Sequence, residues 1–400
     1  MSDHIMGVYN RAPLAVERGE GVWLYDVKGE KYLDCVAGIA TDALGHAHPK
    51  LIAALNDQAQ KIWHVSNIFQ IPGQEALARR LTDACFADVV FFTNSGTEAI
   101  ETAIKTARRY HFRKGNEERI DIIGFAGAFH GRTYAAINAA GVPSYLEGCG
   151  PRLSGFHQLT LDDQAGIEAA IARPTTAAVI VEPVQGEGGA RALTEEWLRR
   201  VRELCTRHGV LLIYDEVQSG MGRTGQLFAH QWFDGVAPDI MAIAKALGGG
   251  FPVGACLATD EAASGMTVGI HGSTFGGNPL AMAVGIAAFD EIAKPETLAN
   301  VRSVSEVLKQ GLGAVAARYP DVVVELRGKG LLVGVKLVDA VSNRDFMALA
   351  REQKLLVAGG GENCVRMLPA LILSEEEALE AVRRFELACE VARSRIAKAA

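Results

Sequence analysis

The sequence predicts an α/β fold: a mostly parallel sheet in a large domain, followed by a smaller α/β domain at the C-terminus. Short uninterrupted apolar runs, typical of strands buried on both faces, recur before residue 245. Amphipathic helical segments separate these runs, and strands that alternate with helices form parallel sheets through right-handed crossovers. From about residue 296 the pattern becomes that of antiparallel strands between two long helices. We expect an N-terminal segment (1–60) that packs with the small domain, a large domain (61–295) and a small domain (296–400).

The N-terminal part predicts a hairpin and two helices. Two alternating segments within residues 22–36 flank a Lys-Gly pair, which fits a small hairpin. An amphipathic helix is expected from about Leu51, and a second one over residues 73–85. Between the hairpin and the first helix, His46 and His48 stand two residues apart, as metal ligands on a strand would. No Cys, Asp or Glu lies directly beside them, so we interpret them as structural histidines of a loop.

The next part of the chain predicts a strand, a tight turn and a helix. The strand is Val89–Thr93, the turn is Asn94–Thr97, and the helix continues to about Arg109. Ser95 and Glu98 have the spacing of a capping box, which by itself accounts for both residues. The free N–H groups and the dipole of a helix N-terminus also make such a turn suitable for an anion, phosphate above all.

Two further strands lead to polar loops at the same edge of the sheet. Residues 120–125 lead to Phe129, which could stack on an aromatic ring, and to Arg132, which could bind a carboxylate in bidentate fashion. A core phenylalanine and a solvated arginine are the alternatives. The next strand, 177–181, leads to a glycine-rich loop with two acids that could form a catalytic pair, Glu182 and Glu187.

The two most informative strands each end in one charged residue. The apolar run Val210–Tyr214 ends in Asp215, and the run Ile240–Ala244 ends in Lys245. Ligands bind at the carboxyl edge of open α/β sheets, and an unpaired acid or amine in apolar surroundings is costly. A pyridine-type aldehyde cofactor would stabilise both groups, because its protonated ring nitrogen pairs with the carboxylate and its aldehyde forms a Schiff base with the amine. An ordinary Asp–Lys ion pair is the alternative.

The remaining elements complete the two domains. Helices over 195–208 and 279–292 belong to the large domain. In the small domain we expect a helix over 296–319, strands on both sides of a turn at 327–330, a further helix and strand, and a last helix from Ser374. The last helix begins with acidic and ends with basic residues, which matches its dipole.

Composition excludes several classes of partner. The net charge of −7 disfavours nucleic acid and anionic membranes. Seven scattered cysteines without a Cys-x-x-Cys pattern indicate reduced thiols, and the N-terminus lacks a basic segment followed by an apolar stretch. Residues 262–289 carry no Asp, Glu, Lys or Arg, but they contain too many glycines and polar residues to span a membrane. We therefore expect a cytoplasmic protein without a signal peptide.

Several segments together carry a family resemblance. These are Asp215–Gln218, Gly222–Gly225, Pro238–Asp239, and Lys245 with the glycine run that follows it. In these segments the chain resembles the class III (omega) aminotransferases, which are pyridoxal 5′-phosphate-dependent transferases of fold type I. The resemblance extends over nearly the whole chain. It departs from many relatives at Thr41 and Asp42, which replace Val-Asn beside the substrate cavity.

The resemblance implies a role for each site residue. Lys245 and Asp215 are the catalytic residues: the lysine forms the Schiff base and the aspartate contacts the ring nitrogen. Thr274 contacts the cofactor phosphate of the partner subunit in a homodimer. Arg132 and Ser273 face the substrate, and Glu187 is a gate that pairs with Arg366. The full set of implied cofactor contacts is Ser95, Gly96, Thr97, Phe129, Asp215, Glu216, Val217, Gln218, Lys245 and Thr274.

Within the family, the chain is most similar to the acetylornithine-type members. This similarity implies transfer of the terminal amine of N2-acetyl-L-ornithine to 2-oxoglutarate, a step of arginine biosynthesis, and a second role with N-succinyl-diaminopimelate. Ornithine, succinylornithine and 4-aminobutyrate are the alternative donors. A dinucleotide-binding dehydrogenase is a rival from another class, but no Gly-x-Gly-x-x-Gly follows the strand at 89–93. A catalytically silent ligand-binding regulator is a further rival, disfavoured by the presence of Lys245 and Asp215.

Overall fold

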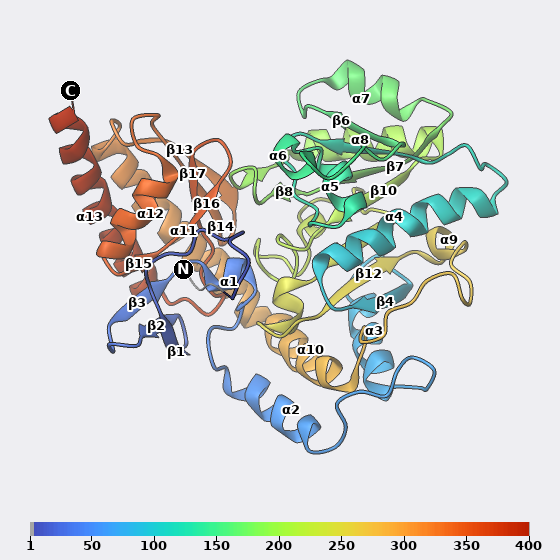
Figure 1. Cartoon of the computed structure of the whole chain (residues 1–400), viewed down its shortest axis with the longest axis horizontal. Coiled ribbons are helices and arrows are strands. Elements are labelled where there is room, and N and C mark those ends of the chain that lie inside the picture. Colours follow the sequence, from blue (N-terminus) through green and yellow to red (C-terminus); the bar gives the residue numbers. More distant parts are fainter. Residues whose placement is uncertain (1–3, 400) are drawn as a thin grey trace.

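A seven-stranded sheet forms the centre of the larger of two lobes in the computed structural model, which describes residues 4–399 (Figure 1). All neighbouring strands are parallel except the two pairs that involve β12. The predicted α/β class with a mostly parallel sheet is therefore confirmed. In spatial order the strands are β4 (Val89–Thr93), β12 (Gly254–Ala258), β11 (Ile240–Ile243), β10 (Leu211–Asp215), β7 (Thr176–Val181), β5 (Asp121–Phe125) and β6 (Phe156–Leu159).

Both faces of this sheet are buried, as the apolar runs predict. Ile180 and Ile213 point into a core that they share with helix α4 (Gly96–Arg113). Their neighbours Val179 and Leu212 point into a second core on the other face. That core is closed by α7 (Gln164–Ile171) and α8 (Glu195–His208). Because side chains alternate along a strand, one continuous apolar run supplies both cores.

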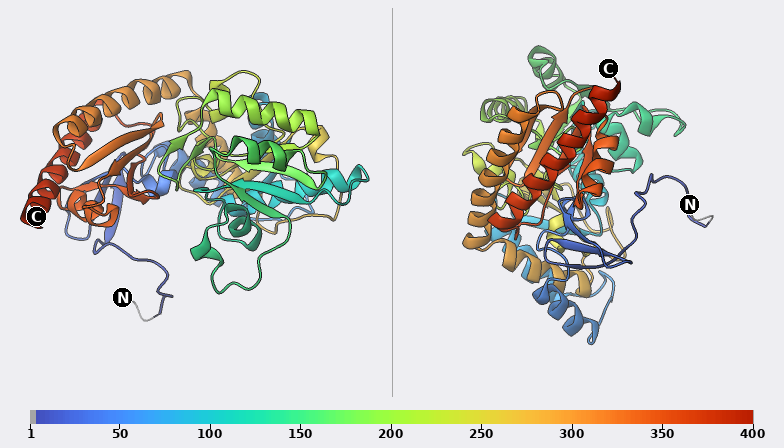
Figure 2. Two further views of the ribbon diagram at one scale, coloured as in Figure 1. Left: turned by 90° about the horizontal axis from the view of Figure 1, so that it is seen from above. Right: turned by 90° about the vertical axis from the view of Figure 1, so that its left-hand side faces the viewer.

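The smaller lobe contains two further sheets. An antiparallel sheet has the order β13 (Val323–Lys329), β14 (Leu332–Leu337), β17 (Cys364–Met367) and β16 (Ala358–Gly360). Its helices are α11 (Pro295–Arg318), α12 (Asn343–Glu352) and α13 (Glu375–Ala399) (Figure 2). The turn predicted at 327–330 is shifted, because β13 continues through Lys329 to pair with Leu332, which leaves Gly330 and Leu331 as the turn.

The N-terminal strands join this lobe. Strands β1 (Val16–Glu20), β2 (Trp23–Asp26) and β3 (Lys31–Asp34) form an antiparallel sheet, and β15 (Leu355–Leu356) adds to β3 in parallel. This pairing places the beginning of the chain against its C-terminal part. The three domain limits given above stay a prediction.

A third group of helices lies below the large sheet in Figure 1. Helix α10 (Pro279–Ile292) packs against α2 (Pro49–Ala59) and α3 (Pro72–Asp83). Within residues 4–399, no helix is both long enough and apolar enough to cross a membrane.

Candidate active site

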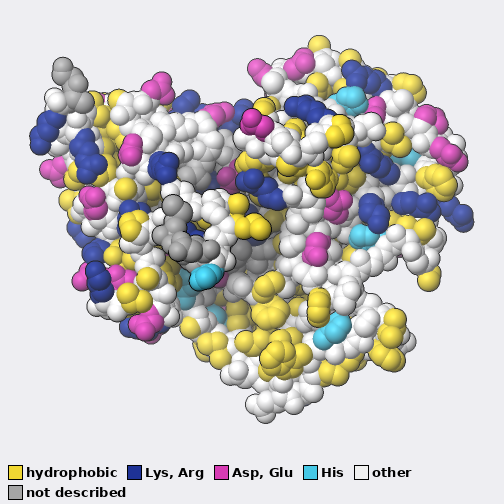
Figure 3. All heavy atoms as spheres, viewed as in Figure 1, with side chains coloured by type: hydrophobic (Ala, Val, Ile, Leu, Met, Phe, Trp, Pro, Cys, Tyr) yellow, Lys and Arg dark blue, Asp and Glu magenta, His cyan; other side chains and the backbone are white. Residues whose placement is uncertain are grey.

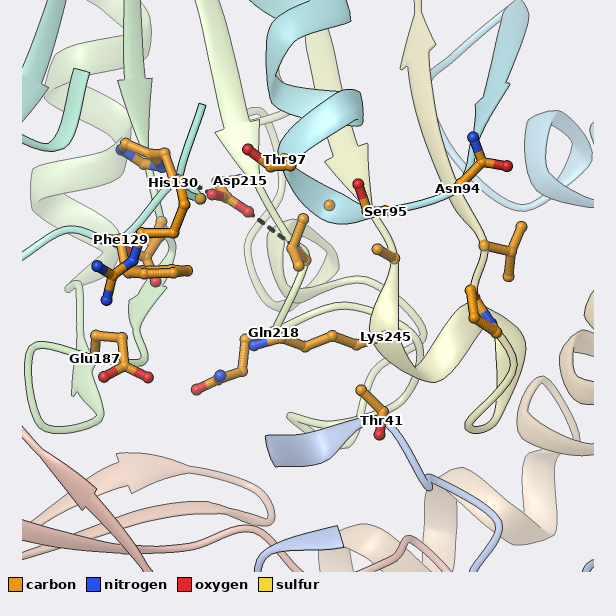
Figure 4. A pocket seen from close by; sticks show the side chains of 18 of the residues that line it. Thr41, Asn94, Ser95, Thr97, Phe129, His130, Glu187, Asp215, Gln218 and Lys245 are labelled. Atoms are coloured by element: carbon orange, nitrogen blue, oxygen red, sulfur yellow. Dashed lines mark hydrogen bonds and ion pairs between the residues drawn. The ribbon is translucent and has the colours of Figure 1, made fainter. Parts of the chain in front are cut away.

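A cavity of about 330 Å³ lies at the carboxyl edge of β10 and β11 (Figure 4). Loops from four parallel strands, the N-terminus of α4 and the N-terminal segment of the chain form its wall. The cavity therefore lies where ligands bind in open α/β sheets. Its lining residues are Thr41, Asn94, Ser95, Gly96, Thr97, Phe129, His130, Gly131, Arg132, Glu182, Glu187, Asp215, Val217, Gln218, Ala244, Lys245, Gly250, Phe251, Pro252 and Val253.

Asp215 is a buried carboxylate with fixed orientation. Its Oδ1 accepts a hydrogen bond from the Val217 backbone N–H at 3.0 Å, and its Oδ2 lies 2.8 Å from Nδ1 of the buried His130. Burial alone disfavours the imidazolium, but the hydrogen bond and the charge of Asp215 raise the pKa of His130 overall. The imidazole thus fixes the orientation of the Asp215 carboxylate. The sequence analysis assigned no role to His130, although its place between Phe129 and Arg132 was the available signal.

Lys245 lies two residues after the end of β11 and begins the short 3-10 helix η2 (Lys245–Gly248). Its φ of 44° is unusual for a residue with a side chain, and such strained conformations concentrate at functional sites. Burial, helped by the positive charge of Arg366, lowers the pKa of Lys245 to about 8. A substantial fraction of the amine is therefore neutral and nucleophilic near neutral pH.

The N-terminus of α4 also lines the cavity, through Ser95, Gly96 and Thr97. Ser95 caps the helix by accepting a hydrogen bond from the Glu98 N–H, which is one half of the predicted capping box, whereas the Glu98 carboxylate accepts from the Asn94 N–H and not from that of Ser95. The first N–H groups of any helix have no partner within the helix. A Cβ at Gly96 would lie 2.7 Å from a Val217 methyl, and one at Gly131 would lie 2.2 Å from the Thr97 hydroxyl. The two glycines thus let three loops pack closely around the N-terminus of α4.

Phe129 and Val217 line the cavity from different loops, as a flat ring between two apolar groups requires. The position of Phe129 is fixed by Glu182, whose Oε1 accepts from the Phe129 N–H at 2.8 Å, while its Oε2 accepts from the Gly186 N–H at 2.9 Å. Burial and the nearby Asp215 raise the pKa of Glu182. Because both carboxylate oxygens bind backbone, Glu182 shapes the loops and does not form the catalytic pair with Glu187 that the sequence left open.

Glu187 does pair with Arg366, as the resemblance implies. The Arg366 Nη2 lies 2.7 Å from Glu187 Oε1 and also donates to the Gly359 carbonyl, and Nη1 donates to Gln218 Oε1 at 3.3 Å. Arg366 is 2% exposed and lies behind the cavity wall, whereas Glu187 and Gln218 line the cavity. A movement of Glu187 would therefore expose a buried positive charge to the cavity.

Besides Arg366, three predicted site residues lie outside the cavity of this chain. Glu216 follows Asp215 but points to the other side, where its carboxylate accepts hydrogen bonds from the backbone N–H groups of Ala229 and His230. The structure thus gives the Glu216 side chain a structural role, and a cofactor contact of this residue stays a prediction. Ser273 and Thr274 lie on a separate loop, where Ser273 Oγ accepts from the Gly276 N–H at 2.9 Å and Thr274 is exposed.

The cavity residues fit a phosphorylated aromatic aldehyde with a basic ring nitrogen. A depressed-pKa lysine is available for the aldehyde, and a fixed carboxylate for a protonated nitrogen. A helix N-terminus is available for the phosphate. These three groups come from β11, β10 and the start of α4, and in Figure 4 their labelled side chains surround one space.

Comparisons with known proteins identify the family of the chain. The family model described as Aminotransferase class-III matches residues 6–389. A protein of Caulobacter vibrioides named acetylornithine aminotransferase 2 is 66% identical over 98% of this chain and 97% of its own length. The crystal structure of N-acetylornithine aminotransferase from Stenotrophomonas maltophilia has a TM-score of 0.84 and 38% identity, covering 98% of each chain. A structure of ornithine aminotransferase from Toxoplasma gondii, with pyridoxal phosphate at partial occupancy, has a TM-score of 0.93 and 30% identity, covering 98% and 94%.

Proposed function

The chain belongs to the class-III aminotransferases, and from this premise we propose that it is an acetylornithine aminotransferase. It transfers the terminal amine of N2-acetyl-L-ornithine to 2-oxoglutarate and yields N-acetyl-L-glutamate 5-semialdehyde and L-glutamate. The observation that supports this substrate best is the 66% identity over 394 residues to a protein named for it. The ornithine-type structure has the higher TM-score but only 30% identity. Backbone similarity therefore identifies the fold-type-I class, and sequence identity favours the substrate.

Each residue of the cavity has its own role in the proposed reaction. Pyridoxal 5′-phosphate, when bound, supplies an aldehyde for the substrate amine and an electron-accepting ring. The neutral amine of Lys245 removes the proton from the carbon that bears the substrate amine. Asp215, held by His130, accepts the hydrogen bond of a protonated ring nitrogen and keeps that charge in place. Gly96 and Thr97 at the start of α4 bind the phosphate.

Two arginines serve the two substrates in turn. Arg132 binds the α-carboxylate of acetylornithine while Glu187 neutralises Arg366. With 2-oxoglutarate, which carries two carboxylates, Glu187 moves aside and both arginines bind. The 2.7 Å contact between Glu187 and Arg366 supports the closed form of this gate. One site can in this way hold two different acids in a ping-pong reaction.

The proposed enzyme is a homodimer in which the partner subunit's loop completes the site. An apolar surface supports this proposal: Ile62, Trp63, Ile68, Phe69 and Phe275 are 44–81% exposed. Figure 3 shows hydrophobic side chains gathered on the lower part of the face, where Figure 1 places α2. Asn67 donates to the Ser273 and Gly276 carbonyls, so this surface and the loop with Thr274 are one structural unit. Such a large apolar area is typical of an interface. The free cysteines of the described chain support a reducing, cytoplasmic location.

An amine-donor panel with 2-oxoglutarate as acceptor tests the proposed substrate. We expect the highest kcat/KM with N2-acetylornithine, lower values with N-succinyl-diaminopimelate and succinylornithine, and the lowest with ornithine and 4-aminobutyrate. Glutamate formation is the readout. A preference for free ornithine or 4-aminobutyrate would overturn the substrate and leave the aminotransferase class intact.

A further inference from the structure

Arg132 is held by aromatic rings and by no acid. Its guanidinium carbon lies 3.6 Å from the centroid of the Tyr145 ring and 5.5 Å from that of Phe129. The two rings meet edge to face, with centroids 6.2 Å apart and an interplanar angle of 86°. In the described part of the chain, no carboxylate lies within ion-pair distance of Arg132. Tyr145 itself does not line the cavity, so it contacts the site only through its neighbours.

This arrangement contrasts with that of Arg366. The acidic partner of Arg366 must move before a substrate carboxylate can replace it. An aromatic face orients a guanidinium through its flat side and leaves the N–H groups along its edge free. That edge is the part of an arginine that binds a carboxylate with two parallel hydrogen bonds. The ring of Tyr145 thus fixes the direction of Arg132 without neutralising it.

Contacts of the chain segments before and after Tyr145 fix its position relative to Arg132. Helix α5 (Tyr134–Ala140) begins two residues after Arg132 and ends at Gly141, which is left-handed with φ 67°. A Cβ at Gly141 would lie 2.2 Å from Gln158 Cγ, so only glycine allows this close turn. The chain then forms α6 (Pro143–Leu146), which carries Tyr145.

The chain after α6 forms a hydrogen bond with helix α5. The Leu153 N–H donates to Oδ1 of Asn138, a buried residue of α5, at 3.0 Å. Arg132 and Tyr145 are therefore attached to opposite ends of one short helix. A shift of either residue relative to the other requires a change in α5 or in its contacts.

We infer that Tyr145 is a positioning residue for the substrate carboxylate: it holds the Arg132 guanidinium with its edge toward the cavity. The inference rests on the proposed role of Arg132 as the site of the α-carboxylate. It predicts that loss of the ring weakens binding of donors that carry a carboxylate and leaves the chemistry of the amine unchanged.

Steady-state kinetics of Tyr145→Leu with two matched donors test this inference. One donor is N2-acetylornithine, and the other is N-acetyl-1,4-diaminobutane, the same molecule without its carboxylate. We expect the KM for N2-acetylornithine to rise roughly two- to fivefold, the size of one exposed cation–π contact, with kcat close to that of wild type. The kcat/KM for the donor without a carboxylate stays unchanged. Tyr145→Phe retains the ring and behaves as wild type with both donors.

Two controls separate this inference from the function on which it rests. Tyr134→Leu alters an exposed tyrosine of α5 that makes no ring contact with Arg132, and it should leave both donors unaffected. Arg132→Gln should raise the KM for N2-acetylornithine at least as far as Tyr145→Leu does. If only Arg132→Gln raises it, or if Tyr145→Leu impairs both donors equally, the role of Tyr145 is overturned. If neither variant changes the KM for N2-acetylornithine, Arg132 does not bind the substrate carboxylate. The proposed function and the role of Tyr145 then both lose that assignment.

Discussion

At the scale of single residues, the site depends on two charges held in unusual states. The pKa of the buried His130 is raised by its hydrogen bond to Asp215, and the pKa of Lys245 is lowered by burial and by Arg366. The sequence alone indicated both Asp215 and Lys245, because each ends a buried apolar run. It could not indicate their supporting groups, since His130 and Arg366 come from distant segments that only the fold brings together.

The lowered pKa of Lys245 predicts how the apoenzyme takes up pyridoxal 5′-phosphate. Only the neutral amine reacts, so the rate of Schiff-base formation should rise about tenfold per pH unit and level off above a pH of about 8. Stopped-flow absorbance would measure this rate. In Arg366→Met the pKa should rise, because a positive charge is lost and Glu187 is left unpaired, and the plateau should move to higher pH. A plateau near the ordinary lysine value of 10.5 in the wild type would contradict the account.

At the scale of elements, the four-residue turn α1 (Ala37–Ala40) is the most strained part of the site. Ala37, Gly38, Ile39 and Ala40 all have φ between 45° and 65°. A left-handed conformation costs about 1–2 kcal/mol for each residue with a side chain, and nothing in the residue types Ala and Ile predicts it. The turn leads directly to Thr41 in the cavity wall. Asp34 holds its start, because Asp34 Oδ1 accepts hydrogen bonds from the Val36 and Ala37 N–H groups at 2.8 and 3.1 Å.

His46 supports this turn in a pH-dependent way. Its Nε2 lies 2.8 Å from Asp34 Oδ2, and this hydrogen bond raises the pKa of His46. A raised folded-state pKa stabilises the protein below the unfolded value and loses that effect as the pH rises through the folded value. His46→Gln should therefore lower the Tm by roughly 2–6 °C at about pH 6 and by much less at about pH 9. Thermal denaturation at several pH values measures the difference.

His48 provides a control, because its effect on stability should depend on pH in the opposite direction. Burial lowers the pKa of His48, so its protonation destabilises the fold as the pH falls. His48→Gln should therefore be more stable than the wild type at low pH and equal to it at high pH. If both variants lost the same stability at every pH, the ion pair between His46 and Asp34 would have no part in holding the turn. The interpretation of these two residues as structural loop histidines rests on the same measurement.

At the scale of the whole molecule, the sequence predicted the α/β class and most helices and strands of the large lobe, because burial on both faces leaves a simple apolar pattern. It did not reveal β12, whose five residues are mostly small and follow a glycine run. It also gave no role to Tyr145, because a contact between a loop tyrosine and an arginine leaves no periodic pattern. For Glu216, the sequence motif gave the position of the residue but not the direction of its side chain, which binds the Ala229 N–H.

The proposed homodimer predicts that two impaired variants restore each other's activity. Thr274→Ala should weaken binding of pyridoxal 5′-phosphate, and Lys245→Ala should abolish activity. In a mixed dimer one site carries both substitutions and the other carries neither, so mixing the variants with exchange of subunits should recover activity. Failure of recovery in confirmed mixed dimers would contradict a contact across the interface.

The oligomeric state of a variant tests whether the apolar surface is the dimer interface. Phe69→Asp should produce monomers in analytical ultracentrifugation, because it places a charge on a side chain that is 64% exposed in the single chain and buried in the proposed dimer. Val324→Asp is the matched control, since Val324 is 57% exposed on β13 of the other lobe and should leave the dimer intact. Dimers that persist in Phe69→Asp would place the interface elsewhere.

The central claim is that one covalent attachment point, Lys245, lies opposite Asp215 across a single ring-sized cavity. Borohydride reduction of the purified enzyme, followed by peptide mass mapping, tests this claim most directly. We expect a pyridoxyl group on Lys245 and on no other lysine, with the label absent from Lys245→Ala. A label on a different lysine, or none on the coloured wild-type enzyme, would contradict it.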